Sequence, residues 1–106
     1  MAVAAAQFFN HIDAFVDYRK TIYETSEETI RSNCIDLNLF RDFVNERKAS
    51  SIDGPTVMKF QYHLKKQRNN SGPSINRKIF TLRSYGHFLR LQEVPKADKL
   101  PFYDVL

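Results

Sequence analysis

The sequence predicts an all-α fold, a compact four-helix bundle. Three observations predict it: four segments carry apolar residues at helical spacing, polar turn signals separate them, and no convincing strand pattern alternates with them. The chain has 106 residues, of which 42% are hydrophobic and 13% aromatic. This length and composition leave room for one domain with a single aromatic-rich core. We expect the helical domain over residues 1–94.

The first two helices are separated by a short polar interruption. Phe8 and Phe15 share one face of the first helix, which we expect over residues 7–23. Ser26 is a natural N-cap for the second helix, expected over residues 27–47. Two glutamates follow Ser26, where a helix N-terminus favours negative charge.

The third and fourth helices are separated by the clearest loop signal in the chain, a polar run with glycine and proline. The third is expected over residues 55–68, with Pro55 at its first position. The fourth is expected over residues 74–92, and it is apolar on two sides, which is typical of a central helix. The predicted core includes Phe15, Leu37, Phe40, Phe60, Ile79 and Leu82.

The fourth helix also has features outside that core. A second apolar stripe contains Phe80, Phe88 and Leu91, and we expect the first helix or the tail to cover it, because a contiguous exposed patch would mark a docking site. Beyond Pro95 the helical pattern stops, so residues 95–106 are expected to form an extended tail or the start of a linker. Between the apolar stripes lies a polar one of Asn76, Arg83, His87 and Arg90.

Charge is distributed unevenly along the chain. Residues 1–58 carry six basic and nine acidic residues, whereas residues 59–106 carry ten basic and three acidic ones. Eight basic residues and no acidic one lie between Lys59 and Arg90. A solvated face is one explanation, but a footprint for a polyanion such as DNA or RNA is the interpretation we favour. Within the run, we expect Lys65 and Lys66 to be solvated.

Several classes of function are not supported by the sequence. His11, His63 and His87 lack partners at metal-ligand spacing, no glycine-rich phosphate loop is present, and no nucleophile motif is found. We therefore expect no cofactor, no metal and no catalytic residue. The single Cys34 excludes an internal disulfide and fits a reducing compartment, and no apolar run is long enough to span a membrane. We expect a cytoplasmic protein that does not engage membranes.

Two stretches resemble the core-binding (SAM-like) domain at the N-terminus of phage integrases and related tyrosine recombinases. The first is Thr29-Ile30-Arg31-Ser32-Asn33 with Leu37, Phe40 and Phe43. The second is Ser74-Ile75-Asn76-Arg77-Lys78-Ile79 with Leu82-Arg83-Ser84-Tyr85 and Phe88-Leu89. The resemblance covers about residues 7–95.

The resemblance implies a four-helix clamp that closes on one side of double-stranded DNA. The catalytic domain of the same parent recombinase would close on the other side, and further recombinase protomers would share the DNA. The Arg, Lys, His and Tyr signature of that catalytic domain is missing here, and Tyr103 is not assigned as its nucleophile. We therefore expect no enzyme activity from this chain alone, which is either an excised domain or a truncated relative. The DNA-binding positions carried over are Thr29, Arg31, Ser32, Ser74, Asn76, Arg77, Lys78 and Arg83.

Two other functions compete with this interpretation. A helical protein–protein interaction module would use the second apolar stripe to dock a partner helix. A small helix-turn-helix DNA-binding protein would need a turn of three to four residues between two short helices, and the loops here are longer. A mobility shift on random duplex DNA at low salt separates the interaction module from the two DNA-binding alternatives.

Overall fold

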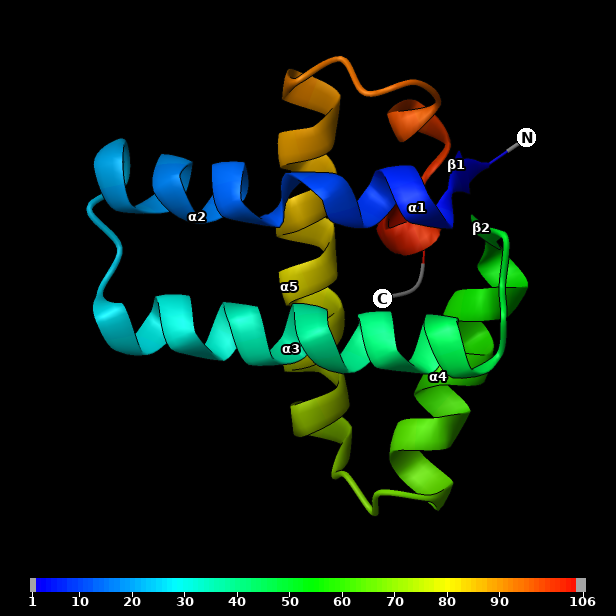
Figure 1. The fold of residues 1–106 in the computed structure, drawn as a ribbon. Coiled ribbons are helices and arrows are strands. Elements are labelled where there is room, and N and C mark those ends of the chain that lie inside the picture. The colour runs from blue at the N-terminus through cyan, green and yellow to red at the C-terminus, as the bar shows by residue number, and fades with distance from the viewer. Residues whose placement is uncertain (1, 105–106) are drawn as a thin grey trace.

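Two helices, α2 and α3, lie side by side in one layer, and the long helix α5 crosses behind both of them (Figure 1). Helix α4 lies beside α5 and contacts α3, so the four longest helices enclose a common core. The structure, a computed structural model, describes residues 2–104 and the side chains of residues 2–102. Its elements are β1 (Val3–Ala4), α1 (Ala5–Phe8), η1 (Phe9–His11), α2 (Ile12–Thr21), α3 (Glu27–Glu46), β2 (Ser51–Ile52), α4 (Gly54–Lys66), α5 (Gly72–Leu91), η2 (Ala97–Lys99) and η3 (Pro101–Asp104).

The predicted all-α architecture is confirmed, with one small addition. Strands β1 and β2 pair antiparallel with Val3 opposite Ile52, and the Ala5 amide donates to the Ser50 carbonyl at 2.9 Å. Both strands are two residues long, which is too short to give an alternating sequence pattern. Val3 and Ile52 are fully buried, so the pair closes one end of the core.

Side-chain caps fix the starts of the three helices that follow α2. Ser26 caps α3 as predicted, its hydroxyl accepting from the Thr29 amide at 3.3 Å. Asp53 caps α4 in the same way, accepting from the Thr56 amide at 2.9 Å. Helix α5 begins two residues earlier than predicted because Ser71 is its N-cap. The proline that follows is compatible with the first turn of a helix, where no backbone hydrogen bond is lost.

The first predicted helix is interrupted at η1, between α1 and α2. The Tyr85 hydroxyl lies at this interruption, donating to the Phe8 carbonyl and accepting from the His11 amide at 3.2 Å. Burial raises the pKa of Tyr85 above its ordinary range. The hydroxyl therefore stays protonated and supplies partners that a continuous helix would have provided from its own backbone.

The core is built largely from aromatic rings. All six residues predicted to be buried are at most 2% exposed. Phe40 lies near the centre, with its ring centroid 4.8 Å from that of Phe60 and 6.0 Å from that of Phe8. Tyr85 packs edge-on against Phe8 and Phe15, at 5.0 and 5.3 Å. These edge-to-face arrangements are favourable for aromatic pairs and tie the first segment to α5.

The second apolar stripe of α5 is only partly covered, contrary to the prediction. Phe88 is buried against Phe15 and Tyr18 of α2, with ring centroids 5.6 and 5.2 Å apart. Phe80 and Leu91, however, are 61% and 54% exposed. Because α2 crosses α5 instead of running along it (Figure 1), it covers only part of this stripe.

The segment after α5 folds back onto this helix, whereas the sequence predicted an extended tail or the start of a linker. Residues 97–104 form the two short turns η2 and η3, both in contact with α5. Ala97, Leu100 and Phe102 are buried, and Phe102 packs against Phe8 and Phe40. Burying these apolar side chains stabilises the folded-back path over an extended one. The side chain of Tyr103 lies outside the described part of the chain.

Replacing Leu82 by Ala should destabilise the domain strongly, because Leu82 is fully buried in the core. We expect the free energy of unfolding to fall by about 2–5 kcal/mol. Chemical denaturation followed by circular dichroism measures this, with Leu91→Ala on the exposed side of the same helix as the matched control. The control should stay within about 0.5 kcal/mol of the parent. Equal losses for the two variants would contradict the assigned core.

Candidate nucleic-acid interface

A groove of about 400 Å³ opens where the end of α2 and the start of α3 pass α5. In Figure 1 these two ends extend beyond α5 on the same side of the molecule. Side chains from all three helices therefore meet at the groove. Its lining residues are Arg19 from α2, Glu28, Thr29, Ser32 and Asn33 from α3, and Arg77, Phe80, Thr81 and Ser84 from α5.

A buried carboxylate organises the floor of this groove. Asp36 of α3 has a side chain only 1% exposed, and it accepts two hydrogen bonds from the Arg77 guanidinium at 3.0 and 3.3 Å. The Thr81 hydroxyl donates a third at 2.9 Å. Since α5 supplies both donors, this network fixes the crossing of α3 and α5.

The network also holds Arg77 in a defined orientation. Its side chain remains 52% exposed although it forms a bidentate ion pair. A guanidinium has five N–H donors in a planar fork, so donors remain available to a second anion. Arg77 is therefore positioned at the groove with its rotamer already selected.

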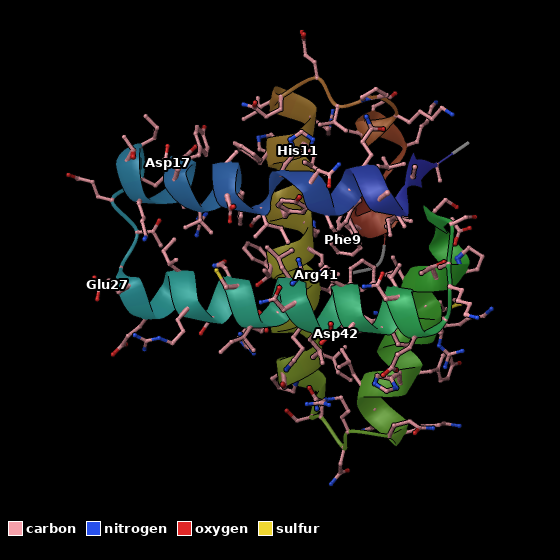
Figure 2. The ribbon with its side chains drawn as sticks, viewed as in Figure 1. Phe9, His11, Asp17, Glu27, Arg41 and Asp42 are labelled. Carbon is pink, nitrogen blue, oxygen red and sulfur yellow. The ribbon has the colours of Figure 1, made fainter. Side chains whose placement is uncertain are left out.

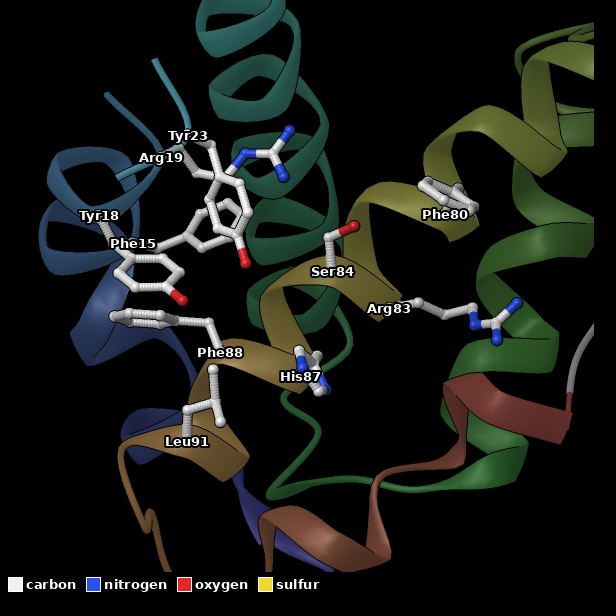
Figure 3. Close-up of a pocket in the computed structure, with 10 residues that line it drawn as sticks. All are labelled: Phe15, Tyr18, Arg19, Tyr23, Phe80, Arg83, Ser84, His87, Phe88 and Leu91. Atoms are coloured by element: carbon white, nitrogen blue, oxygen red, sulfur yellow. The ribbon is translucent and has the colours of Figure 1, made fainter. Parts of the chain in front are cut away.

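A polar stripe on α5 borders the groove. Asn76, His87 and Arg90 are exposed and Arg83 is half-buried, as expected for the polar stripe predicted from the sequence. Figure 3 shows Ser84 between Arg19 and Phe80, whereas Arg83 extends away from the aromatic side chains of α2. The groove and the stripe thus form one continuous surface along α5.

Two of the predicted contacts, Ser74 and Lys78, lie on α5 away from the polar stripe and do not line the groove. The Lys78 ammonium donates to the Ser74 hydroxyl at 3.0 Å, and that hydroxyl in turn donates to the Asn70 side chain at 3.2 Å. Burial lowers the pKa of Lys78, and the nearby charge of Arg77 lowers it further. At about 100° per residue, Lys78 points roughly 160° away from Asn76 around the helix.

Arg31 also points away from the groove. It is exposed on the outer face of α3, roughly 160° around the helix from the groove residue Asn33. Glu27 and Asp42 are also exposed on this helix (Figure 2), and both lie within about 40° of Arg31 around its axis. This outer face mixes charges of both signs, unlike the stripe on α5.

The structure thus divides the eight predicted positions into groups. It brings Thr29, Ser32 and Arg77 together in the groove and places Asn76 and Arg83 on the adjoining stripe. Ser74 and Lys78 contact each other elsewhere, and Arg31 lies alone among these positions on the outer face of α3.

Arg19 and Ser84 line the groove but were not predicted. The Arg19 guanidinium lies 5.8 Å from the Phe15 ring centroid, and its buried Nε has no hydrogen-bond partner among the described residues. Arg19 looked like an ordinary basic residue in the last turn of a helix. No sequence signal identifies it, because only the crossing of α2 over α5 brings it to the groove.

A second hollow of about 280 Å³, lined mainly by aromatic and other apolar residues, adjoins the groove (Figure 3). It shares Arg19, Phe80 and Ser84 with the groove. Tyr18 and Tyr23 line its other side, with their ring centroids 5.4 Å apart. The uncovered part of the second apolar stripe therefore borders the cationic surface directly.

Comparison with known protein families finds a match over most of the chain. The model of the phage integrase N-terminal SAM-like domain matches residues 12–93, which include α2 through α5. No curated protein and no solved structure matches the chain significantly. None of the described helices is long and apolar enough to cross a membrane, and the described side chains form no cluster able to hold a metal ion.

Replacing Arg77 by Ala should destabilise the fold, because it leaves the buried Asp36 carboxylate with fewer donors. We expect the free energy of unfolding to fall by about 1–3 kcal/mol. In an Asp36→Asn background the same replacement should cost less, and this double-mutant cycle isolates the pair. Arg31→Ala is the control, because it removes the same charge from an exposed position on α3. If Arg77→Ala destabilised the chain no more than this control, the structural role of Arg77 would be refuted.

Proposed function

Because this chain belongs to the family of phage integrase N-terminal SAM-like domains, we propose that it binds duplex DNA as the clamp domain of a site-specific tyrosine recombinase. The family connects the chain with site-specific recombination, and the matched domain is distinct from the catalytic one. Strand exchange would be the activity of the parent recombinase. The partners we propose are double-stranded DNA, the catalytic domain and other recombinase protomers, in the cytoplasm.

The preorganised Arg77 is the observation that carries this proposal. Phosphate contacts are made by Arg and Lys side chains, by hydroxyl groups and by helix N-termini. The groove combines Arg77 and Arg19 with Thr29 and Ser32, two hydroxyl residues near the start of α3. Arg77 is already held by Asp36, so binding a phosphate costs little side-chain entropy.

The proposed contact surface consists of the groove and the α5 stripe, with Arg83 and Asn76 at its border. Most hydrogen bonds between protein and DNA go to phosphate and sugar, so we propose a sequence-tolerant contact in which phosphates dominate. Asn76 has the chemistry to read an adenine edge if α5 enters the major groove. Arg31, Ser74 and Lys78 are retained only as peripheral contacts.

A protein-docking role is the second candidate. The exposed Phe80 and Leu91 and the neighbouring Tyr23 all line the apolar hollow beside the groove. Apolar side chains gathered around one hollow favour a protein contact. We propose that the catalytic domain or another protomer occupies it, which is compatible with DNA on the adjacent cationic surface.

The DNA-binding proposal predicts weak, strongly salt-dependent binding of a 20-base-pair duplex. Contacts to roughly four to six phosphates give a log–log slope of about −4 to −5, at ~0.9 per contact. Arg19→Gln and Arg83→Gln should each reduce the size of this slope by about 1, because each removes one phosphate contact. Titrations at several salt concentrations, followed by fluorescence anisotropy, measure the slopes.

Arg31→Gln and Lys78→Gln are matched controls that remove the same charge from other faces. We expect both to keep nearly the parent slope. If they abolished the salt dependence while Arg19→Gln and Arg83→Gln had no effect, the assigned surface would be wrong. Absence of any binding by the parent chain at low salt would refute the DNA-binding function itself.

The same proposal predicts that the purified chain neither cuts nor relaxes DNA. Phosphoryl transfer to a tyrosine requires preorganised cationic groups around the scissile phosphate. Tyr85, the most deeply buried tyrosine described, is instead engaged with the backbone of the first segment. Incubation with supercoiled plasmid followed by gel electrophoresis tests this, and relaxation that copurifies with the chain would overturn it.

A further inference from the structure

The side of α4 that faces away from the core combines apolar and basic side chains. Its exposed residues are Met58, Lys59, Tyr62, Lys65 and Lys66. We infer that this α4 outer face docks an acidic amphipathic segment of a partner protein, a helix that carries apolar side chains and carboxylates on one side. The inference goes beyond the proposed DNA binding and does not depend on it.

Helix geometry gathers the five residues on one side of α4. At about 100° per residue, Met58 lies about 40° from Tyr62 around the helix axis, and the three lysines lie within about 60° of Tyr62. Phe60 and Leu64, each about 160° from Tyr62, are fully buried. The α4 outer face is therefore distinct from the face that this helix packs into the core.

Met58 and Tyr62 form the apolar part of the α4 outer face. Each of these side chains is 60% exposed. Tyr62 lines two further hollows, one of about 250 Å³ towards the end of α3 and one of about 350 Å³ beside Met58. Methionine and tyrosine are enriched in protein interfaces, and a thioether has no donor to offer a phosphate. Removing these side chains from water therefore requires an apolar partner surface.

The charge around the two apolar side chains is entirely basic. Helix α4 contains no acidic residue, and no acidic residue lines either hollow. The first hollow is lined by Arg47, Lys59, Tyr62, His63, Lys66 and Gln67, and the second by Met58, Gln61, Tyr62 and Lys65. Cations around an apolar centre complement a partner whose carboxylates surround apolar side chains of its own.

Aromatic rings hold two of these cations in place. The Arg47 guanidinium lies 4.7 Å from the centroid of the Phe43 ring. The Lys66 ammonium lies 5.7 Å from the centroid of the Tyr62 ring. Cation–π contacts orient a charge without neutralising it, so both groups keep their attraction for a carboxylate.

Duplex DNA and a second copy of the chain fit the α4 outer face less well. Helix α4 lies by the end of α3, whereas the groove proposed for DNA opens at the start of α3 (Figure 1). A second copy would offer the exposed Ile35, which has Glu28 and Asp42 about 20° to either side of it around α3. Arg31 is exposed on the same face of α3, so this contact would bring a cation against the lysines of α4.

The test uses a synthetic acidic helical peptide of about 20 residues, with leucine and glutamate on one side of the helix. Two peptides of the same length are compared with it, one with glutamine for every glutamate and one with alanine for every leucine. We expect both to bind the whole chain at least about tenfold more weakly, because each lacks half of the proposed complement. Fluorescence anisotropy of the labelled peptides measures the affinities.

Two double variants that lose equal charge locate the polar half of the contact. Lys59→Gln with Lys66→Gln should weaken binding of the acidic peptide by about tenfold. Lys20→Gln with Lys99→Gln removes two exposed lysines from other elements, and it should change the affinity by less than about twofold. Thermal melts verify that both variants fold.

A second pair of double variants locates the apolar half. Met58→Ala with Tyr62→Ala should weaken binding of the acidic peptide by about tenfold. Ile22→Ala with Ile35→Ala removes two equally exposed apolar side chains from other surfaces and should change the affinity by less than about twofold. Equal effects of the two pairs would contradict the assigned face.

Three other outcomes would overturn the inference. The first is that the chain binds the alanine-substituted peptide as tightly as the acidic amphipathic one, or binds neither at low salt. The second is that the Lys59 and Lys66 variant loses salt-dependent DNA binding but keeps its peptide affinity, which would assign the face to DNA. The third is self-association of the parent chain that the α4 variants abolish, which would assign it to a second copy. Peptide binding is measured without DNA, so its failure leaves the proposed DNA binding untouched.

Discussion

The buried carboxylate of Asp36 is the constraint on which the rest of the functional surface depends. A buried charge is costly unless it is paired and hydrogen-bonded, and Asp36 obtains its partners from two successive turns of α5. This requirement fixes where α3 crosses α5 and how α5 is rotated about its own axis. The crossing then determines which side chains line the groove. The same interaction leaves the Arg77 side chain half-exposed, so one residue stabilises the fold and is available for the proposed phosphate contact.

Tyr85 has a corresponding role one turn after Thr81 along α5. Its ring packs against Phe8 and Phe15, and its hydroxyl satisfies two backbone groups where the first segment changes from α1 to α2. Beyond this interruption α2 crosses α5 (Figure 1), which brings Arg19 to the groove and buries Phe88. The same crossing leaves Phe80 and Leu91 exposed, because α2 covers α5 only where the two helices meet. The apolar hollow and the groove therefore adjoin each other as consequences of one packing arrangement.

The acidic and basic parts of the sequence form different helices of the fold. The basic second half forms α4 and α5, whereas the acidic first half includes α2 and α3, on which Asp17, Glu27 and Asp42 are exposed (Figure 2). Two basic residues of the first half, Arg19 and Arg47, lie at the ends of α2 and α3. Aromatic rings hold both guanidinium groups, Phe15 for Arg19 and Phe43 for Arg47. The core thus contributes directly to the positions of the surface cations.

Local signals in the sequence were sufficient for the fold class, the approximate helices and the core, because helical periodicity and capping act over a few residues. Ser26 and the six predicted core residues are examples, all confirmed. Three of the predicted contact residues, Thr29, Ser32 and Arg77, lie together in the groove. The sequence alone did not distinguish these three from Arg31 and Lys78, which do not line it. That separation depends on how α3 and α5 are rotated against each other, which the Asp36 network decides. The place of Arg19 at the groove and the folded-back tail likewise depend on contacts between residues far apart in sequence, which no local pattern encodes.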